Sequence, residues 1–385
     1  MASLKIGIAG KPNAGKSTLF SSITGTMVAI GNYAFTTIEP NEGVGFMDTR
    51  CPHIDLNKKC NPRHGRCENG VRYVPVLMVD VPGLIEGSST GKGMGNAFMD
   101  SLRDTTAIIN LLDPVGEERN ILSPDELKEE AEKTEEEIVS WFSSRFSSDW
   151  DKLVRKYAQV KVPLEDILLQ KGGFFNLRLK DIREILSRHR FPDEIAKWTD
   201  DDRKEFSKVV MTEIKPIIRV VNKGDLIEKR EDYVKNGFTI ISSDYELSLE
   251  KAYSAGLISN LTDILPTEKA NEKQRAALEM IRSSYEKGDM HRIFDVISDI
   301  IKNKLSRIVV YPVYDESKWT DKDGNVLPDA FIMTRGDTAE DLAFAVHTDI
   351  GNGFIRAINA RSKMVIGRTY ELQDSDVIRI VAKTK

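Results

Sequence analysis

The sequence predicts an α/β protein with a mostly parallel β-sheet, an inserted helical subdomain and a small C-terminal α+β module. Three observations support this fold class. Near-continuous apolar runs of strand length alternate with Gly-rich turns, a charge-rich helical segment separates two groups of these runs, and short strands surround one helix near the C-terminus. Apolar runs of this kind are typical of parallel strands that helices cover on both faces.

Composition sets the broad class. The chain has 385 residues, of which 40% are hydrophobic and 30% charged, as in globular proteins of two or three domains. No apolar run approaches the ~20 residues of a membrane helix, and no signal peptide is recognisable at the start. Three cysteines exclude a disulfide framework, so we expect a cytoplasmic protein. The net charge of −5 excludes a strongly basic nucleic-acid binder overall, although not a local basic face.

The predicted strands form one domain that comprises residues 1–115 and 209–270. The first strand runs into a Gly-rich turn, which is followed by a helix from about Ser17. Each run is four to six residues long and bounded by polar or Gly-rich segments, as buried strands are. The predicted strands are Lys5–Ala9, Val74–Val79, Ala107–Leu112, Pro216–Val221 and Phe238–Ile241.

Residues 116–208 are predicted to form the inserted helical subdomain. Their share of charged residues far exceeds the chain average, which we interpret as solvated helical faces. Ser123, followed by Pro124 and two acids, is typical of a helix N-terminus.

Residues 271–304 are predicted to be a helical linker, and residues 305–385 a separate module. The module has strands at Ile308–Val313 and Val377–Val381, around a helix that begins near Thr338 with the spacing of a capping box. We interpret His347 as a packed or partly exposed residue of this helix rather than as a ligand.

The segment from Gly10 to Ser17 matches the phosphate-loop pattern G-x-x-x-x-G-K-[ST] between a strand and a helix. Backbone N–H groups of such a loop and the helix N-terminus bind phosphate oxygens. We expect Lys16 to reach the β- and γ-phosphates and Ser17 to ligate Mg²⁺. The expected nucleotide contacts of this segment are Gly10, Lys11, Pro12, Asn13, Ala14, Gly15, Lys16, Ser17 and Thr18.

Three further motifs follow predicted strands. Asp80 is placed to hold Mg²⁺ through water, and the N–H of Gly83 can contact a γ-phosphate. Asn222–Asp225 places a carboxylate that suits the N1–H and N2–H₂ edge of guanine, which adenine lacks. Together these motifs lie at the carboxyl ends of successive strands, where α/β sheets bind ligands. The expected base-binding residues are Asn222, Lys223, Asp225, Ser242 and Ser243.

With these motifs in order, the sequence resembles the P-loop GTPases of the Obg family, in particular the archaeal and eukaryal GTP-type sister group of the YchF-like branch. Asn32–Asn41 is similar to switch I, which implies that Thr37 binds Mg²⁺ and senses the γ-phosphate, with Thr36 as the alternative. Asp80–Leu84 resembles switch II. The resemblance implies catalytic roles for Lys16, Thr37 and Gly83.

The resemblance also implies an activity. It is that of a slow molecular switch, linked to the ribosome or translation, that hydrolyses GTP to GDP and phosphate. Leu84 replaces the Gln that orients water in many GTPases, so intrinsic hydrolysis is expected at ~10⁻³ s⁻¹ or below. Two alternatives remain: a nucleotide-gated RNA- or ribosome-binding module with incidental turnover, and an Obg-like ATPase. The intact Asn-Lys-x-Asp pattern argues against the ATPase, because ATP-preferring YchF proteins have lost it.

Two further expectations rest on the resemblance. Asn13 implies a K⁺ site beside the α- and γ-phosphates, although Asn13 can also serve only to stabilise the loop turn. Thr334–Ala343 is similar to the start of the helix in a TGS domain, a ubiquitin-like β-grasp module, which implies a ribosome or structured RNA as partner. An acid-free stretch of that module is a candidate basic face, with an ordinary solvated surface as the alternative. Its basic residues are Arg356, Arg361, Lys363 and Arg368.

All the cysteines, Cys51, Cys60 and Cys67, fall in one 17-residue window with His53 and His64. A structural Zn²⁺ held by the cysteines and His53 is one interpretation. A buried cysteine cluster and redox pairing are the others, because the spacing lacks the close C-x₂₋₄-C pair of many zinc sites.

Overall fold

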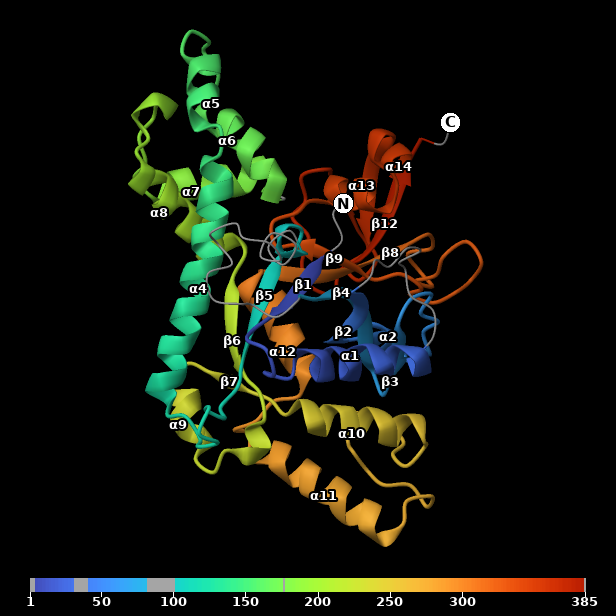
Figure 1. The fold of residues 1–385 in the computed structure, drawn as a ribbon. Coiled ribbons are helices and arrows are strands. Elements are labelled where there is room, and N and C mark those ends of the chain that lie inside the picture. Colours follow the sequence, from blue (N-terminus) through green and yellow to red (C-terminus); the bar gives the residue numbers. More distant parts are fainter. Residues whose placement is uncertain (1–3, 31–40, 82–100, 176, 384–385) are drawn as a thin grey trace.

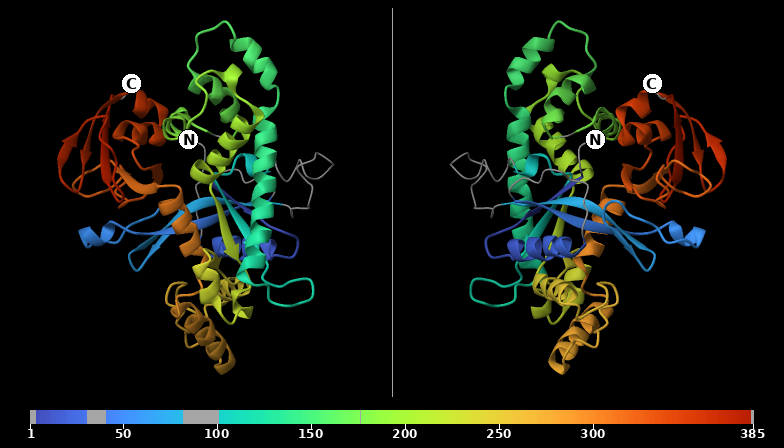
Figure 2. Two further views of the ribbon diagram at one scale, coloured as in Figure 1. Left: turned by 90° about the vertical axis from the view of Figure 1, so that its left-hand side faces the viewer. Right: turned by 90° about the vertical axis from the view of Figure 1, so that its right-hand side faces the viewer.

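The computed structural model describes residues 4–30, 41–81, 101–175 and 177–383 (Figure 1). A central β-sheet with its helices carries a helical arm and a C-terminal domain with a second sheet (Figures 1 and 2). The arm and the C-terminal domain rise from the same end of the central sheet and lie side by side. Arg178 of the arm donates a hydrogen bond to Thr334 Oγ1 of the C-terminal domain at 3.1 Å.

The first sheet has the strand order β2-β4-β1-β5-β6-β7 and is mostly parallel, which confirms the predicted fold class. β2 and β3 run antiparallel to β4. The sequence analysis did not predict β2, whose two glycines and polar residues give it no clear apolar run. The strands are β1 (Lys5–Ala9), β2 (Glu42–Arg50), β3 (Arg66–Glu68), β4 (Val71–Asp80), β5 (Ala107–Leu112), β6 (Ile217–Val221) and β7 (Thr239–Ile240).

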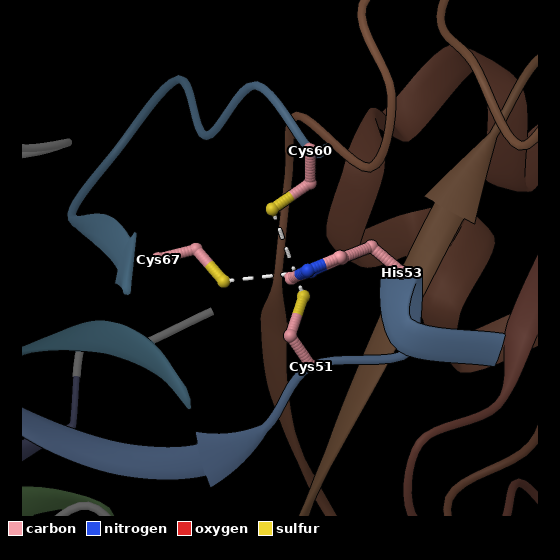
Figure 3. A group of neighbouring side chains, drawn as sticks. All are labelled: Cys51, His53, Cys60 and Cys67. Atoms are coloured by element: carbon pink, nitrogen blue, oxygen red, sulfur yellow. Dashed lines mark hydrogen bonds between the residues drawn. The ribbon is translucent and has the colours of Figure 1, made fainter. Parts of the chain in front are cut away.

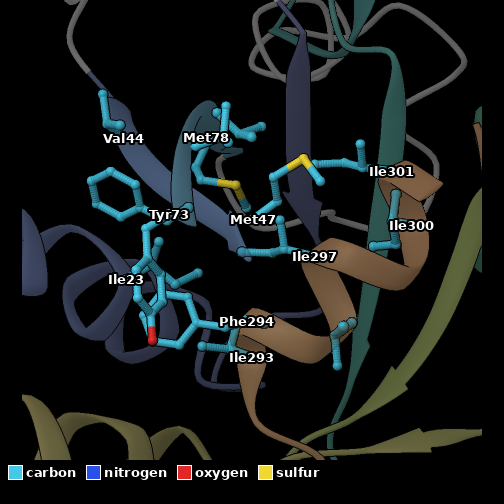
Figure 4. Close-up of a cluster of buried hydrophobic side chains, with 14 of the residues drawn as sticks. Ile23, Val44, Met47, Tyr73, Met78, Ile293, Phe294, Ile297, Ile300 and Ile301 are labelled. Carbon is cyan, nitrogen blue, oxygen red and sulfur yellow. The ribbon is translucent and has the colours of Figure 1, made fainter. Parts of the chain in front are cut away.

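One face of this sheet is covered by α1, α10 and α12, whose apolar side chains share a core with the strands. In Figure 4, Ile297 of α12 and Ile301 of the π-helix that continues it lie close to Met47 and Met78 of the sheet. The C-terminal part of the expected linker, residues 271–304, therefore packs into this core. The helices of this part are α1 (Lys16–Ile30), α2 (His53–Leu56), α9 (Arg230–Lys235), α10 (Ser243–Ser254), α11 (Glu272–Glu286) and α12 (Ile293–Asp299), which continues as a π-helix over Ile300–Lys304.

The inserted helical subdomain is confirmed, and it covers the other face of the sheet. The Ser123 hydroxyl accepts from the Glu126 N–H, and the Glu126 carboxylate accepts from the Ser123 N–H, so the predicted helix start is a capping box. Aromatic side chains fill the arm, with the rings of Phe142 and Phe175 3.8 Å apart. Its helices are α4 (Pro124–Ser147), α5 (Trp150–Tyr157), α6 (Leu164–Gly172), α7 (Leu179–Arg188) and α8 (Asp200–Val209), with short turns at Gly173–Phe175, Ile195–Lys197 and Val210–Ile214.

The C-terminal domain has a sheet of order β11-β10-β12-β8-β9, in which β8 and β12 are parallel. The Thr338–Asp341 capping box is present at the start of α13. His347 is exposed and its Nδ1 accepts from the Asp349 N–H at 3.1 Å, so it caps the following helix. The elements are β8 (Arg307–Val313), β9 (Phe331–Thr334), α13 (Ala339–Val346), α14 (Thr348–Asn352), β10 (Phe354–Asn359), β11 (Met364–Ile366) and β12 (Val377–Ala382).

The helices that the structure describes include none with the length and apolarity to cross a membrane. The limits of the domain division (1–115 with 209–270, 116–208, 271–304 and 305–385) stay a prediction.

Lys215, buried where the insertion returns to β6, should make stability depend on pH. Its ammonium donates to the Arg103 carbonyl at 2.6 Å, and burial lowers its pKa to about 7 from 10.5, with Asp104 opposing the shift. Between these values the unfolded chain binds the extra proton, so the free energy of unfolding should rise with pH, by at most ~1.4 kcal/mol per pH unit.

The Lys215→Met variant should lose this rise, while the exposed control Lys208→Met should keep it. The measurement is the urea midpoint of each protein at pH 7, 8 and 9. Parallel pH profiles for wild type and Lys215→Met would show that Lys215 is charged in the folded protein at pH 7 to 9.

Candidate nucleotide-binding site

The phosphate loop joins the carboxyl end of β1 to α1, as its pattern predicts. Gly10 and Gly15 adopt φ angles of +150° and +90°. A Cβ at Gly10 would lie 2.3 Å from the Leu111 carbonyl oxygen, and one at Gly15 would lie 2.2 Å from Asn222 Nδ2. Only glycine fits both positions. Asn13 is left-handed, with φ 68°, a conformation that asparagine tolerates.

Lys16 lies beneath this loop rather than in solvent. Its Nζ donates to the carbonyl oxygens of Gly10 at 2.9 Å and Lys11 at 2.8 Å. Burial lowers the pKa of Lys16, and the nearby Asp80 carboxylate opposes that shift. The ammonium is thus held against the loop, where an incoming phosphate can take over from the carbonyl groups.

Ser17 and Asp80 lie together at the end of β4. Ser17 Oγ donates to Asp80 Oδ2 at 3.4 Å. Burial raises the pKa of Asp80, while Lys16 and Ser17 favour its ionised form. A hydroxyl and a carboxylate beside a phosphate loop are oxygen ligands of the kind Mg²⁺ prefers, so these residues fit the ion. The other residues expected to take part, Thr37 with its alternative Thr36, Gly83 and Leu84, lie outside the described residues.

Asn222 connects the base-binding motif to the phosphate loop. Its buried amide Nδ2 donates to the Ala14 carbonyl at 2.8 Å. Its Oδ1 accepts from both the N–H and the Oγ of Ser243, at 2.9 and 2.8 Å. The structure therefore brings together three segments that the sequence analysis singled out separately.

A further contact joins Asp225 to Ser242, the residue before Ser243. Ser242 Oγ donates to Asp225 Oδ1 at 2.6 Å and accepts from the Tyr245 N–H at the start of α10. The preceding Lys223 is left-handed, with φ 52°. The remaining expected residues lie on the loop or just beyond it: Pro12 and Asn13 are exposed, Ala14 is buried, and Thr18 is half-buried.

The sequence analysis missed three residues that support these loops. Lys223 Nζ bonds Asp113 at 2.6 Å. Asp113 directly follows β5, so its place at a strand end was a usable signal. Glu130 of the helical arm pairs with Lys11 at 3.1 Å, and Arg230 donates to the Gly224 carbonyl at 2.7 Å. The Lys11–Glu130 pair has no local sequence signal, because it joins segments that are far apart in the chain.

The cysteine window folds into one cluster at a separate place (Figure 3). One donor atom from each of Cys51, His53, Cys60 and Cys67 lies within 4.8 Å of all the others. The sulfur atoms of Cys51 and Cys60 are 3.8 Å apart, and Cys67 Sγ lies 3.5 Å from His53 Nδ1. The expected ligand set is therefore assembled, and His64 is not part of it.

The expected basic face of residues 354–368 is partly neutralised. Arg361 pairs with Asp55 at 2.5 Å, and Arg368 pairs with Glu340 at 3.0 Å. Lys363 donates to the Glu316 carbonyl at 2.6 Å. Within the described part of the chain, Arg361 and Arg368 form ion pairs whereas Arg356 and Lys363 form none, so two of the four basic side chains expected on this face are neutralised.

Three family models match the chain. Residues 5–144 match the model described as 50S ribosome-binding GTPase, and residues 320–382 match the TGS domain. Residues 220–315 match the G4 motif-containing domain of the Obg-like GTPase YGR210-like.

Relatives match over the full length. The uncharacterized GTP-binding protein MJ1332 of Methanocaldococcus jannaschii is 39% identical over 99% of both chains. The crystal structure of a GTP binding protein from Pyrococcus horikoshii OT3 is 31% identical, with a TM-score of 0.77 over 99% of this chain and 100% of that one. Obg-like ATPase 1 of Xenopus laevis is 26% identical over 98% of this chain and 91% of its own.

A shorter match is to the ribosome-binding ATPase YchF of Mycoplasma genitalium, which is 42% identical over 28% of each chain. The full-length likeness to MJ1332 and to the Pyrococcus protein, on a fold that carries the same motifs, is decisive for the family. The chain belongs to the Obg-like, YchF-related family of P-loop GTPases with a C-terminal TGS domain.

Proposed function

We propose that this protein binds GTP and hydrolyses it to GDP and phosphate. The observation that carries the proposal is the junction at Asn222, which bonds Ala14 of the phosphate loop and Ser243 at once. Asp225 follows Asn222 by three residues, and its Oδ1 accepts from the Oγ of Ser242, the neighbour of Ser243. A carboxylate in this place can accept two hydrogen bonds from the N1–H and N2–H₂ groups of guanine.

The alternative of an Obg-like ATPase has less support. Adenine presents a bare N1 acceptor and no 2-amino group, so it would leave the Asp225 carboxylate unpaired. The relative that matches at 39% over 99% of the chain is named a GTP-binding protein, whereas the full-length match named an ATPase is at 26%. The model that matches residues 220–315 is also named for its G4 motif.

Hydrolysis would rely on positioning and charge neutralisation rather than covalent chemistry. Lys16 and the loop N–H groups would hold the β- and γ-phosphates while water attacks the γ-phosphorus. Ser17 would hold Mg²⁺ directly and Asp80 through water. Bound there, the ion would neutralise negative charge on the phosphate oxygens. By resemblance, Thr37 and Gly83 would contact the γ-phosphate, and Leu84 would keep intrinsic turnover slow.

We infer that the partner is the ribosome or a structured RNA. YchF of Mycoplasma genitalium, which matches part of this chain, is named a ribosome-binding ATPase. A groove of about 1460 Å³ lies between the helical arm and the C-terminal domain. Lys180 on one wall and Arg335 on the other are exposed and form no ion pair within the described residues, so both can meet phosphate groups.

Guanine should be selected over adenine, and Asp225 should be responsible. Sites built on such pairing reject the wrong ligand by ~10⁴-fold. The Asp225→Asn change should weaken GTP and favour xanthosine triphosphate, whose 2-position is a carbonyl. The measurement is titration of GTP, ATP and xanthosine triphosphate against nucleotide-free protein. The exposed Asp232→Asn variant serves as control, and similar affinities for ATP and GTP would contradict the prediction.

K⁺ should stimulate hydrolysis and Na⁺ should not, because Asn13 would help to hold the larger cation beside the phosphates. Glycine tolerates the left-handed conformation of Asn13, so Asn13→Gly keeps the turn and removes the amide. The stimulation should disappear in this variant. Rates are compared in the two salts at matched ionic strength. Stimulation that persists in Asn13→Gly would mean that Asn13 serves only the turn.

Binding to ribosomes should depend on the groove and on the nucleotide. Lys180→Glu combined with Arg335→Glu should reduce cosedimentation with ribosomes and make it less sensitive to salt, because fewer phosphate contacts remain. The control, Lys128→Glu combined with Lys133→Glu, makes the same charge change on α4 outside the groove. Equal cosedimentation of both double variants would exclude the groove as the ribosome-binding surface.

A single-turnover hydrolysis assay with and without ribosomes separates a switch from a binding module. A ribosome-accelerated rate is expected for the switch. A rate that ribosomes leave unchanged, together with nucleotide-dependent binding, would favour the module with incidental turnover.

A further inference from the structure

The cysteine loop, residues 51–67, connects the outer ends of two paired strands. β2 and β4 pair from Glu42 opposite Val79 to Arg50 opposite Val71. Asp80 of the nucleotide site therefore lies at one end of this pair, and the cysteine loop follows Arg50 at the other. The loop is remote from the phosphate site, so any role for its cysteines is separate from nucleotide binding.

All four donor atoms lie within 4.8 Å of one another, and two of the distances between them match those of a tetrahedral metal centre. With Zn–S bonds of about 2.3 Å and Zn–N bonds of about 2.05 Å, tetrahedral angles place two sulfurs about 3.8 Å apart and a sulfur about 3.6 Å from a nitrogen. Cys51 and Cys60 are 3.8 Å apart at sulfur, and Cys67 lies 3.5 Å from the His53 nitrogen. A disulfide would require about 2.05 Å, so the thiols are unpaired.

The loop has little regular secondary structure of its own. Its regular structure is limited to one turn of helix, α2, and the first residues of β3. Between them runs a polar stretch, Asn57–Gly65, in which Cys60 is the buried apolar side chain. Small segments that lack a core of their own are commonly held by a metal or by disulfides.

The C-terminal domain is seated on this same loop. The N–H groups of Asn61 and Arg63 donate to the carbonyls of Val326 and Pro328 at 2.9 and 2.8 Å. The Arg63 guanidinium pairs with Asp321 and Asp329 at 3.0 and 3.1 Å.

Two further contacts hold the same interface. Asp55, two residues after His53, pairs with Arg361 at 2.5 Å. The buried Arg72 donates to the carbonyls of Leu327 and Pro328 at 3.0 and 2.8 Å. The cluster residues are thus neighbours in sequence of the residues that make the interdomain contacts.

We propose that Cys51, His53, Cys60 and Cys67 bind one structural Zn²⁺, and that this ion holds the cysteine loop in the shape on which residues 319–329 of the C-terminal domain dock. Thiolate and imidazole ligands suit Zn²⁺. Four protein ligands leave no open position, as in structural rather than catalytic zinc sites.

The first test is the metal content of the full-length protein, purified with reductant and without chelator. One zinc per chain is expected in wild type and in the His64→Ala control, which changes a histidine of the same loop outside the cluster. Cys60→Ser and Cys67→Ser should lose most of it. Exchange with Co²⁺ should give the intense visible absorption of a tetrahedral thiolate site. Less than a tenth of an equivalent of metal in wild type would overturn the proposed zinc site. The same zinc content in Cys60→Ser as in wild type would also overturn it.

The second test is hydrogen exchange of the wild-type protein before and after zinc removal by a chelator. Peptides covering residues 58–66 and 319–329 should lose most of their protection, while peptides of α4 keep theirs. Arg63→Ala should retain zinc and still loosen residues 319–329, because it removes docking contacts without touching a ligand.

Zinc removal that leaves residues 319–329 protected would overturn the docking role. Loss of protection that extends to α4 would also overturn it, since the ion would then stabilise the whole fold rather than one interface.

Discussion

The buried side chain of Asn222 holds the nucleotide site together. Its amide group bonds the phosphate loop on one side and the start of α10 on the other. Because it approaches so closely, Gly15 cannot carry a side chain. The phosphate loop and the Asn222–Asp225 segment are therefore coupled through one amide, and a displacement of either would be transmitted to the other.

A small number of side-chain contacts likewise joins the domains. The arm reaches the C-terminal domain through Arg178 and Thr334, and the cysteine loop reaches it through Arg63. The C-terminal domain is thus attached at two separate places to elements that extend from one sheet. The pair β2 and β4 runs from the nucleotide site to the second of these attachments, so the domain sits at the far end of strands that begin beside Asp80.

Several basic side chains that the sequence makes candidates for ligand binding instead form ion pairs within the chain. Arg361 was expected on a basic face for RNA, yet it pairs with Asp55 across a domain boundary. Lys11 and Lys223, both in nucleotide-binding motifs, are paired with Glu130 and Asp113. A count of basic residues in a stretch therefore overstates what is available to a partner, because acids from distant segments neutralise them.

The sequence by itself determined the features that depend on neighbouring residues. Apolar runs predicted the parallel strands, the capping patterns at Ser123 and Thr338 predicted helix starts, and the phosphate-loop motif predicted the strand-turn-helix around Lys16. These features are local, because their geometry follows from the types and spacing of adjacent residues.

Tertiary structure decided what depends on distant partners. β2 is a strand because it pairs with β4 and packs against α12, although its own residues show no strand pattern. His53, at the start of α2, joins the cysteines and His64 does not, although both lie in the same window of the sequence. Which charges remain free was likewise decided only by the fold. Spacing along a chain restricts which groups can meet, but packing selects among them, since each distant contact depends on the placement of every element between its two ends.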